Sequence, residues 1–299
     1  MADAHARFST VSPEVGRIEE RAISELLRDD PDGAIALLAD MAVATDPALR
    51  IQARVLARRL LPRLGASGPP QRRGTHRLAV HAGTLEGDLD LERTLDRTGA
   101  RRPRSGSELI TRRFAAAPRA VCLLVDRSGS MGGHAVALAA VAASAVVSAA
   151  GADAGAGAGG AGSERLRCGV IAFASETLVL RSLRDPAPAG RVIDDLLSLR
   201  GHGRTDLAAA LRAASRLLED ASGGRDRIRT AILLSDCLHT RGLDPRAAAG
   251  ALDCLHVLGT SDATDARTAG VALARRGRGH YLPATNAAEL TVSLERALR

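Results

Sequence analysis

Three polar clusters in the second half of the chain have the residue types of a divalent-metal site. The first is the sequence DRSGS at residues 126–130, which directly follows an apolar run at residues 120–125. The second is Thr205, and the third is Asp236, which comes after another apolar run. Carboxylate and hydroxyl oxygens are hard ligands of the kind that Mg²⁺ takes in an octahedral shell. The candidate metal ligands are Asp126, Ser128, Ser130, Thr205 and Asp236.

The elements around these clusters are predicted by the hydrophobic pattern. Residues 120–125 are a continuous apolar run, typical of a strand buried on both faces, and residues 228–234 predict a second strand. Residues 207–218 place their leucines on one face of a helix. Alternating strands and helices predict an α/β domain with a doubly wound, mostly parallel sheet. Because ligands in such sheets bind beyond the carboxyl ends of the strands, where the strand order reverses, we expect the three clusters to converge there.

The beginning of the chain predicts a small all-α unit over residues 1–65. Three helix starts are marked by Ser12-Pro13, Asp30-Pro31 and Asp46-Pro47. Each pairs a good N-cap residue with a proline in the first helical turn, where the missing N–H is not needed. Apolar residues follow at helical spacing, which supports this interpretation.

A connecting segment is expected between the helical unit and the α/β domain. Residues 66–118 begin with a Gly- and Pro-rich linker and become basic. Within them, residues 76–85 predict a short strand, residues 89–95 predict a short helix, and residues 100–113 are expected to form a loop. The α/β domain then occupies residues 119–299.

The three polar clusters together resemble the metal-ion-dependent adhesion site (MIDAS) of von Willebrand factor A (VWA) domains, a Rossmann-like α/β fold. The resemblance implies that Ser128, Ser130 and Thr205 coordinate the metal directly. It implies that Asp126 and Asp236 act mostly through bridging water. It also implies an open metal position, to which a protein partner supplies an acidic side chain.

Within the VWA family, the chain is most similar to the bacterial proteins that work with AAA+ ATPases of the MoxR and magnesium-chelatase type. Residues 91–95 (LERTL) with the basic stretch after them, and residues 279–283 (GHYLP) before a final helix, carry this similarity. It implies a non-enzymatic adaptor whose partner is an AAA+ ATPase or its target. Two residues depart from the family pattern, Arg204 where a small residue is frequent and Cys237 where Gly is common.

Composition excludes several classes of function. All 41 basic residues are arginines, so a Walker-type phosphate loop and Schiff-base chemistry both lack their lysine. Only three Phe and one Tyr are present, which argues against stacking platforms for single-stranded nucleic acid. The four cysteines form no Cys-x-x-Cys pair, which favours a reduced, cytoplasmic protein over a zinc or redox site.

No secretory signal and no membrane span are expected. The first residues contain no continuous apolar segment. Residues 131–150 are long enough for a span, but they are mostly Ala and Val and are interrupted by serines. They therefore predict a buried helix.

Two alternative functions remain open from the residues alone. A serine hydrolase would use Ser130 as its nucleophile, because residues 128–132 partly match a nucleophile elbow. That interpretation gives no role to Asp126 or Thr205. An arginine-rich nucleic-acid-binding protein is the second alternative, based on residues 101–104 and 112–113, but no recognised reading helix accompanies them. For the metal, Mg²⁺ is expected, and Mn²⁺ accepts the same oxygen ligands.

Overall fold

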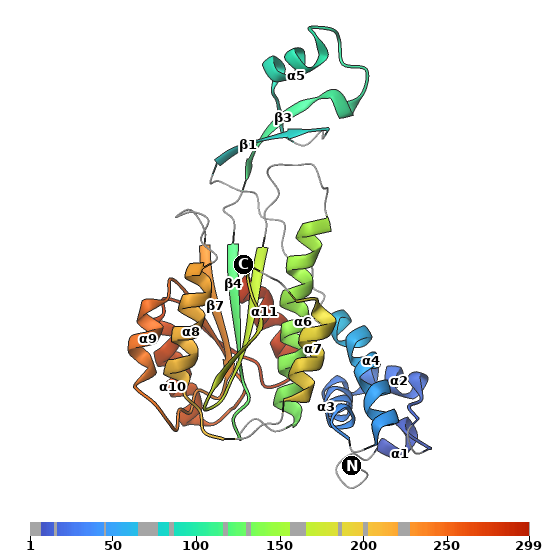
Figure 1. Cartoon of the computed structure of the whole chain (residues 1–299), viewed down its shortest axis with the longest axis vertical. Helices are drawn as coiled ribbons and strands as arrows, with labels where there is room; N and C mark the ends of the chain where they lie inside the picture. Colours follow the sequence, from blue (N-terminus) through green and yellow to red (C-terminus); the bar gives the residue numbers. More distant parts are fainter. Residues whose placement is uncertain are drawn as a thin grey trace.

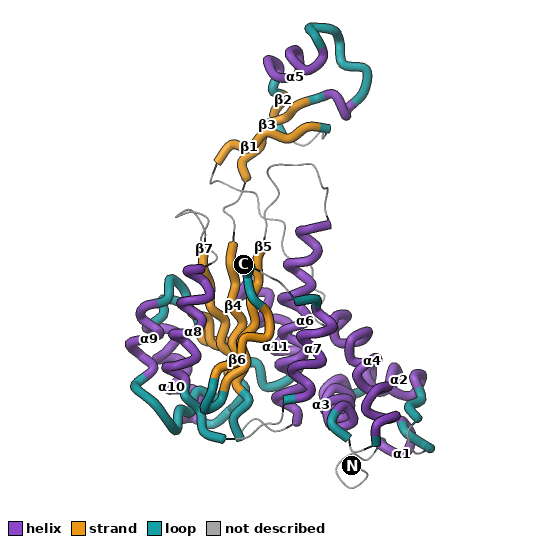
Figure 2. Tube along the Cα trace, in the orientation of Figure 1, coloured by secondary structure: helices purple, strands orange, loops and turns teal. Residues whose placement is uncertain are grey.

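The structure of this chain is a computed structural model, and it forms a helical unit, a small three-stranded unit and a large α/β domain (Figures 1 and 2). The residues that it describes are 7–14, 17–44, 46–64, 77–83, 87–115, 119–129, 133–155, 166–184, 187–199, 203–220 and 228–298.

The α/β domain is built on one mixed sheet with the strand order β6-β5-β4-β7-β8-β9. Its strands are β4 (Arg119–Asp126), β5 (Leu166–Phe173), β6 (Thr177–Arg181), β7 (Ile228–Ser235), β8 (Leu255–Gly259) and β9 (Tyr281–Pro283). All neighbouring strands are parallel except β5 and β6. The chain winds outward from β4 in one direction and from β7 in the other. The predicted doubly wound, mostly parallel sheet is therefore confirmed, and its order reverses between β4 and β7.

Helices cover both faces of this sheet (Figure 1). One face carries α6 (Gly133–Gly155), α7 (Ala189–Ser198) and α11 (Ala287–Leu298), and the other carries α8 (Leu207–Asp220), α9 (Pro245–Ala251) and α10 (Thr264–Arg276). Strand β4 shows why its sequence is apolar throughout. Val121 and Leu123 belong to one core and Cys122 and Leu124 to the other, because successive side chains of a strand point to opposite faces.

The helical unit consists of α1 (Phe8–Val11), α2 (Glu20–Asp29), α3 (Pro31–Ala42) and α4 (Pro47–Leu64). Two of the three predicted helix starts are confirmed. Asp30 Oδ1 accepts the backbone N–H of Gly33 at 2.9 Å, and Asp46 Oδ1 accepts that of Ala48 at 2.9 Å.

The predicted helix start at Ser12-Pro13 is wrong. The Ser12 hydroxyl donates to the carbonyl oxygens of Glu14 and Arg17 instead of accepting a helix amide. It closes a turn between α1 and α2, and α2 begins only at Glu20.

The helical unit packs directly on α6 and α7 of the α/β domain. One continuous apolar cluster includes Leu38 of α3, Val141 of α6 and Ile193 of α7. Arg58 of α4 donates to both carboxylate oxygens of Asp194 on α7, with a distance of 2.8 Å from Nε to Oδ1. Because the sheet covers α6 on one side and the helical unit on another, the Ala- and Val-rich sequence of α6 is buried, as expected. Among the described helices, none is long and apolar enough to cross a bilayer.

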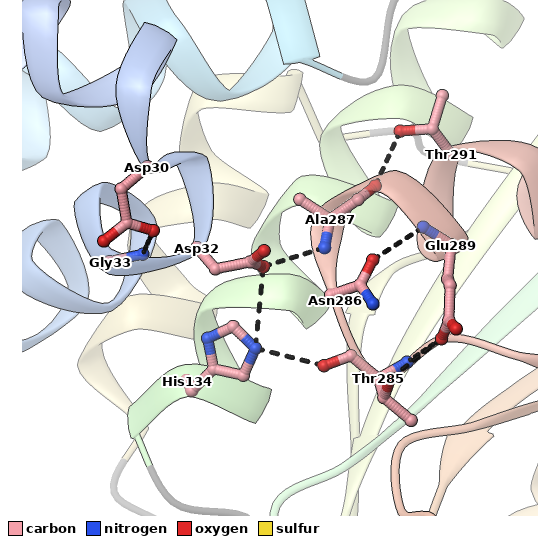
Figure 3. Close-up of polar contacts among 9 residues, drawn as sticks. All are labelled: Asp30, Asp32, Gly33, His134, Thr285, Asn286, Ala287, Glu289 and Thr291. Atoms are coloured by element: carbon pink, nitrogen blue, oxygen red, sulfur yellow. Dashed lines mark hydrogen bonds and ion pairs between the residues drawn. The ribbon is translucent and has the colours of Figure 1, made fainter.

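A polar contact joins the helical unit to the α/β domain beside this apolar face (Figure 3). Asp32 Oδ1, in the first turn of α3, accepts the N–H of Ala287 at the start of α11 at 2.8 Å. The same oxygen lies 3.7 Å from Nε2 of His134, and that nitrogen is 3.2 Å from the carbonyl oxygen of Thr285. Asp32 thus joins three helices at one point.

The third unit is a small antiparallel sheet with the order β1-β3-β2. Its elements are β1 (Arg77–Ala82), β2 (Asp88–Leu89), α5 (Leu91–Thr98), the 3₁₀ turn η1 (Gly106–Glu108) and β3 (Ile110–Ala115). The loop expected at residues 100–113 is therefore wrong in its last part. Residues from Ile110 onward form the central strand, since β1 and β2 pair with β3 from both sides. Strand β3 ends three residues before β4, so this unit joins the amino end of the central sheet.

Candidate metal centre

Asp126 is the last residue of β4 and lies at the reversal point of the sheet. Its relative exposure is 0%, and both carboxylate oxygens accept hydrogen bonds. The backbone N–H of Ser128 donates to Oδ1 at 2.8 Å, and the Ser235 hydroxyl donates to Oδ2 at 2.6 Å. Ser235 ends β7, the strand that pairs with β4. The two strands that flank the crevice are therefore linked through this carboxylate.

No basic side chain among the described residues pairs with the Asp126 carboxyl. Burial raises the pKa of its carboxyl, and the nearby Asp236 carboxylate raises it further, against the opposing effect of the hydrogen bonds from Ser235 and Ser128. Asp236 is itself buried. Neither carboxylate forms an ion pair with any of the described residues. A buried carboxylate without a counter-ion is costly, so a bound cation would stabilise this pair.

Hydrogen bonds tie the three predicted loops to one another in a closed circuit. Gly129 N–H donates to the Gly203 carbonyl at 3.3 Å, which joins the first loop to the second. Thr205 N–H donates to Thr240 Oγ1 at 3.0 Å, and Thr240 N–H returns a bond to the Thr205 carbonyl at 3.1 Å, which joins the second loop to the third. The Asp126 bond already described joins the first to the third. The loops thus hold their oxygens at one edge of the sheet.

Four of the five predicted ligands meet at this edge, and all four are buried: Asp126, Ser128, Thr205 and Asp236. The fifth, Ser130, lies outside the described residues, as does any geometry for the serine-hydrolase interpretation that depends on it. Metal ligation by these side chains therefore remains a prediction. Within the described part of the chain, no three His, Cys, Asp or Glu side chains form a metal-binding group. The oxygen set here combines two carboxylates with hydroxyls.

Sequence reasoning missed two hydroxyl residues that build the site. Ser235 donates to Asp126 and also accepts the N–H of Cys237 at 2.9 Å, and Thr240 holds the Thr205 loop. The available signal for Ser235 was a polar residue directly after the apolar run at residues 231–234. Thr240 gave none, because its partner is 35 residues away along the chain.

Cys237 departs from the family pattern at a position with an unusual backbone. Its φ is 62°, in the left-handed region that favours glycine. Its side chain is buried, and burial raises the pKa of its thiol. Arg204, the other departure, is exposed at the second loop.

The sequence matches one known family. The sequence model of the von Willebrand factor type A domain matches residues 120–291, which is more than half of the chain. The search of curated proteins found no match to this sequence.

Several solved structures are similar to this chain at low sequence identity. An aerotolerance-related membrane protein from Bacteroides fragilis is 18% identical with a TM-score of 0.44, over 60% of this chain and 98% of that one. Proximal thread matrix protein 1 from the mussel byssus, with a zinc-occupied MIDAS motif, is 16% identical with a TM-score of 0.48, over 62% and 48%. A von Willebrand factor type A protein from Catenulispora acidiphila is 19% identical with a TM-score of 0.43, over 63% and 43%. On the family match, this chain belongs to the von Willebrand factor type A domain family.

Proposed function

We propose that this chain is a non-enzymatic adaptor that holds an acidic side chain of a protein partner through a divalent cation. The cation is Mg²⁺, or Mn²⁺ with the same ligands. The observation that carries the proposal is the buried Asp126 carboxylate, which has Asp236 beside it and no counter-ion among the described residues. VWA domains generally serve as adhesion or interaction modules, which supports this choice over an enzyme.

The proposed ligand roles are those that the resemblance to the MIDAS implies, and the hydrogen bonds of Asp126 support its part. Both oxygens of Asp126 accept protein hydrogen bonds, which supports an indirect role through bridging water. Ser128, Ser130 and Thr205 would then supply direct hydroxyl ligands. Neutral hydroxyls leave a dication with excess positive charge, and Mg²⁺ keeps several exchangeable waters. A carboxylate from a partner protein can replace one of these waters.

The proposed partner is an AAA+ ATPase of the MoxR or magnesium-chelatase type, or the target of such an ATPase. The similarity of residues 91–95 and 279–283 to VWA proteins of that kind supports it. In this setting the partner hydrolyses ATP and this chain recognises or positions the target, in the cytoplasm.

The metal half of the proposal is tested by thermal unfolding with and without Mg²⁺. At a Mg²⁺ concentration 100 times the Kd, binding stabilises the fold by about 2.7 kcal/mol, or roughly 4 °C for a chain of this length. Wild type and the control Asp195→Ala, which removes an exposed carboxylate on α7, should show this shift. Thr205→Ala and Asp126→Ala should lose it. Equal shifts in all four proteins would overturn the assigned site.

The partner half is tested by affinity capture from native lysate in Mg²⁺ and in EDTA, with Asp126→Ala alongside. An AAA+ ATPase retained by wild type in Mg²⁺, and lost both in EDTA and with the variant, is the expected result. The same proteins retained in all three conditions would show that the metal does not hold the partner.

A further inference from the structure

Two exposed leucines stand on the loop that follows Asp236. Leu238 is 41% exposed and Leu243 is 70% exposed. We call residues 238–243 the docking loop. Large apolar side chains this exposed are individually common on protein surfaces, so their position and support decide whether they matter.

The docking loop is fastened to two of the proposed metal ligands. Leu238 N–H donates to Asp236 Oδ1 at 3.0 Å. Thr240 and Arg241 both donate their backbone N–H to the Thr205 carbonyl, at 3.1 and 3.2 Å. The loop is therefore part of the rim of the metal site.

A glycine-dependent turn fixes the direction of Leu243. Gly242 has a φ of +89°, and a Cβ placed there would lie 2.5 Å from the carboxyl carbon of Asp206. Asp206 is itself fixed, because its Oδ1 accepts the N–H of Ala209 at 2.8 Å in the first turn of α8. Leu243 is thus presented to solvent from an anchored turn.

Two exposed arginines lie on the same rim. Arg241 belongs to the docking loop, and Arg204 immediately precedes Thr205; both are exposed. Neither forms an ion pair with any described residue, whereas Arg101 and Arg229 elsewhere in the chain are paired with carboxylates. An anionic group of a bound partner would meet these free guanidinium groups.

We propose that the docking loop recognises the residues that flank the metal-bound carboxylate of the partner. Apolar side chains on either side of that carboxylate pack against Leu238 and Leu243, and a further carboxylate pairs with Arg241 or Arg204. The buried core of a protein interface is more apolar than its rim and Arg is enriched at interfaces, which favours an acidic protein segment with apolar side chains such as leucine. This inference rests on the proposed metal-bridged function and adds the sequence character of its ligand.

Three synthetic peptides test the proposal by fluorescence polarisation in Mg²⁺ and in EDTA. Each has one central Asp, flanked by glycines in the first, by leucines in the second, and by leucines with additional glutamates in the third. We expect Mg²⁺-dependent binding of all three, with affinity rising about tenfold from the first peptide to the second, as burial of a leucine side chain implies. A further rise is expected for the third peptide.

Variants of the docking loop and of Arg204 test which side chain causes each increase in peptide affinity. Leu243→Ser should lower the preference for leucine, and the double variant Arg204→Gln with Arg241→Gln should remove the preference for glutamate. Both variants should bind the glycine-flanked peptide as wild type does and keep the Mg²⁺-dependent thermal shift. Leu91→Ser, which changes a leucine that is 60% exposed on α5, is the matched control and should behave as wild type.

The outcomes separate this inference from the function beneath it. Mg²⁺-dependent binding that is equal for all three peptides, or unchanged by both variants, overturns the role of the docking loop and leaves the metal-bridged grip standing. If none of the three peptides binds in an Mg²⁺-dependent way, both the role of the docking loop and the metal-bridged function are overturned.

Discussion

The substitution Leu38→Ala tests whether the helical unit and the α/β domain unfold together in one cooperative transition. Leu38 lies on α3 with 1% relative exposure, in the apolar cluster that also contains Val141 of α6 and Val121 of β4. If the cluster couples the two units, Leu38→Ala must destabilise both together. If they are independent, only the helical unit will be weakened.

The size of the effect follows from the burial of this side chain. A fully buried Leu→Ala change costs about 2–5 kcal/mol, because it removes buried carbons and leaves a cavity. At about 2.1 cal/mol/K of unfolding entropy per residue, a loss of 3 kcal/mol lowers the Tm of a 299-residue chain by about 5 °C.

The single tyrosine of the chain provides a local reporter for the α/β domain. Tyr281 is on β9, and the chain has no Trp, so its intrinsic fluorescence comes mainly from this one site. The ring is packed closely, since a Cβ on Gly270 would lie 2.6 Å from it. Far-ultraviolet circular dichroism follows all the helices at the same time. We expect Leu38→Ala to lower both midpoints by the same amount.

An earlier transition in circular dichroism with an unmoved Tyr281 midpoint would refute this reasoning. It would show that the helical unit is an independent domain that only touches α6 and α7. Leu243→Ala is the control, because a change at an exposed surface position shifts stability by no more than about 0.5 kcal/mol.

Two further predictions concern single sites. Residue 237 has a φ of 62°, a left-handed conformation that costs free energy for every residue except glycine. We therefore expect Cys237→Gly to be about 1 kcal/mol more stable than Cys237→Ala in urea unfolding. An Ala variant of equal or greater stability would contradict backbone strain at this position. The Arg101 side chain and the Arg104 N–H donate to the Glu108 carboxylate and lower its pKa to about 2. This interaction stabilises the fold fully above the unfolded pKa of about 4.5, and the stabilisation is lost as the pH falls through 2. Titration of the Glu108 carboxyl by NMR measures the folded pKa directly. A midpoint near 4.5 would contradict a persistent contact with Arg101.

The sequence predicted the α/β domain well because central strands that are buried on both faces consist mainly of apolar residues. Strands β4 and β7 contain the apolar runs 120–125 and 231–234, and the polar residues that follow these runs mark the reversal point of the sheet. Four of the predicted ligands reached one edge for this reason. Their local pattern and their place at strand ends were both visible in the sequence.

The features that were missed depend on partners far away in the sequence. Strand β3 contains adjacent arginines that suggested a loop, and only its pairing with β1 and β2 makes it a strand. The bond from Ser235 to Asp126 spans 109 residues. The packing of the helical unit on α6 also depends on tertiary contacts. The sequence pattern of its helices indicates that an apolar face is buried, but it does not indicate which element covers that face.

The position of the three-stranded unit sets a minimum separation between the two ends of the molecule. This unit joins the amino end of β4, whereas Asp126 is the last residue of that eight-residue strand. At about 3.3 Å per residue, the seven steps from the first to the last residue of β4 span roughly 23 Å. A protein bound at the metal edge and another bound to the three-stranded unit would therefore contact the chain beyond opposite ends of β4. Their two binding surfaces would be separate.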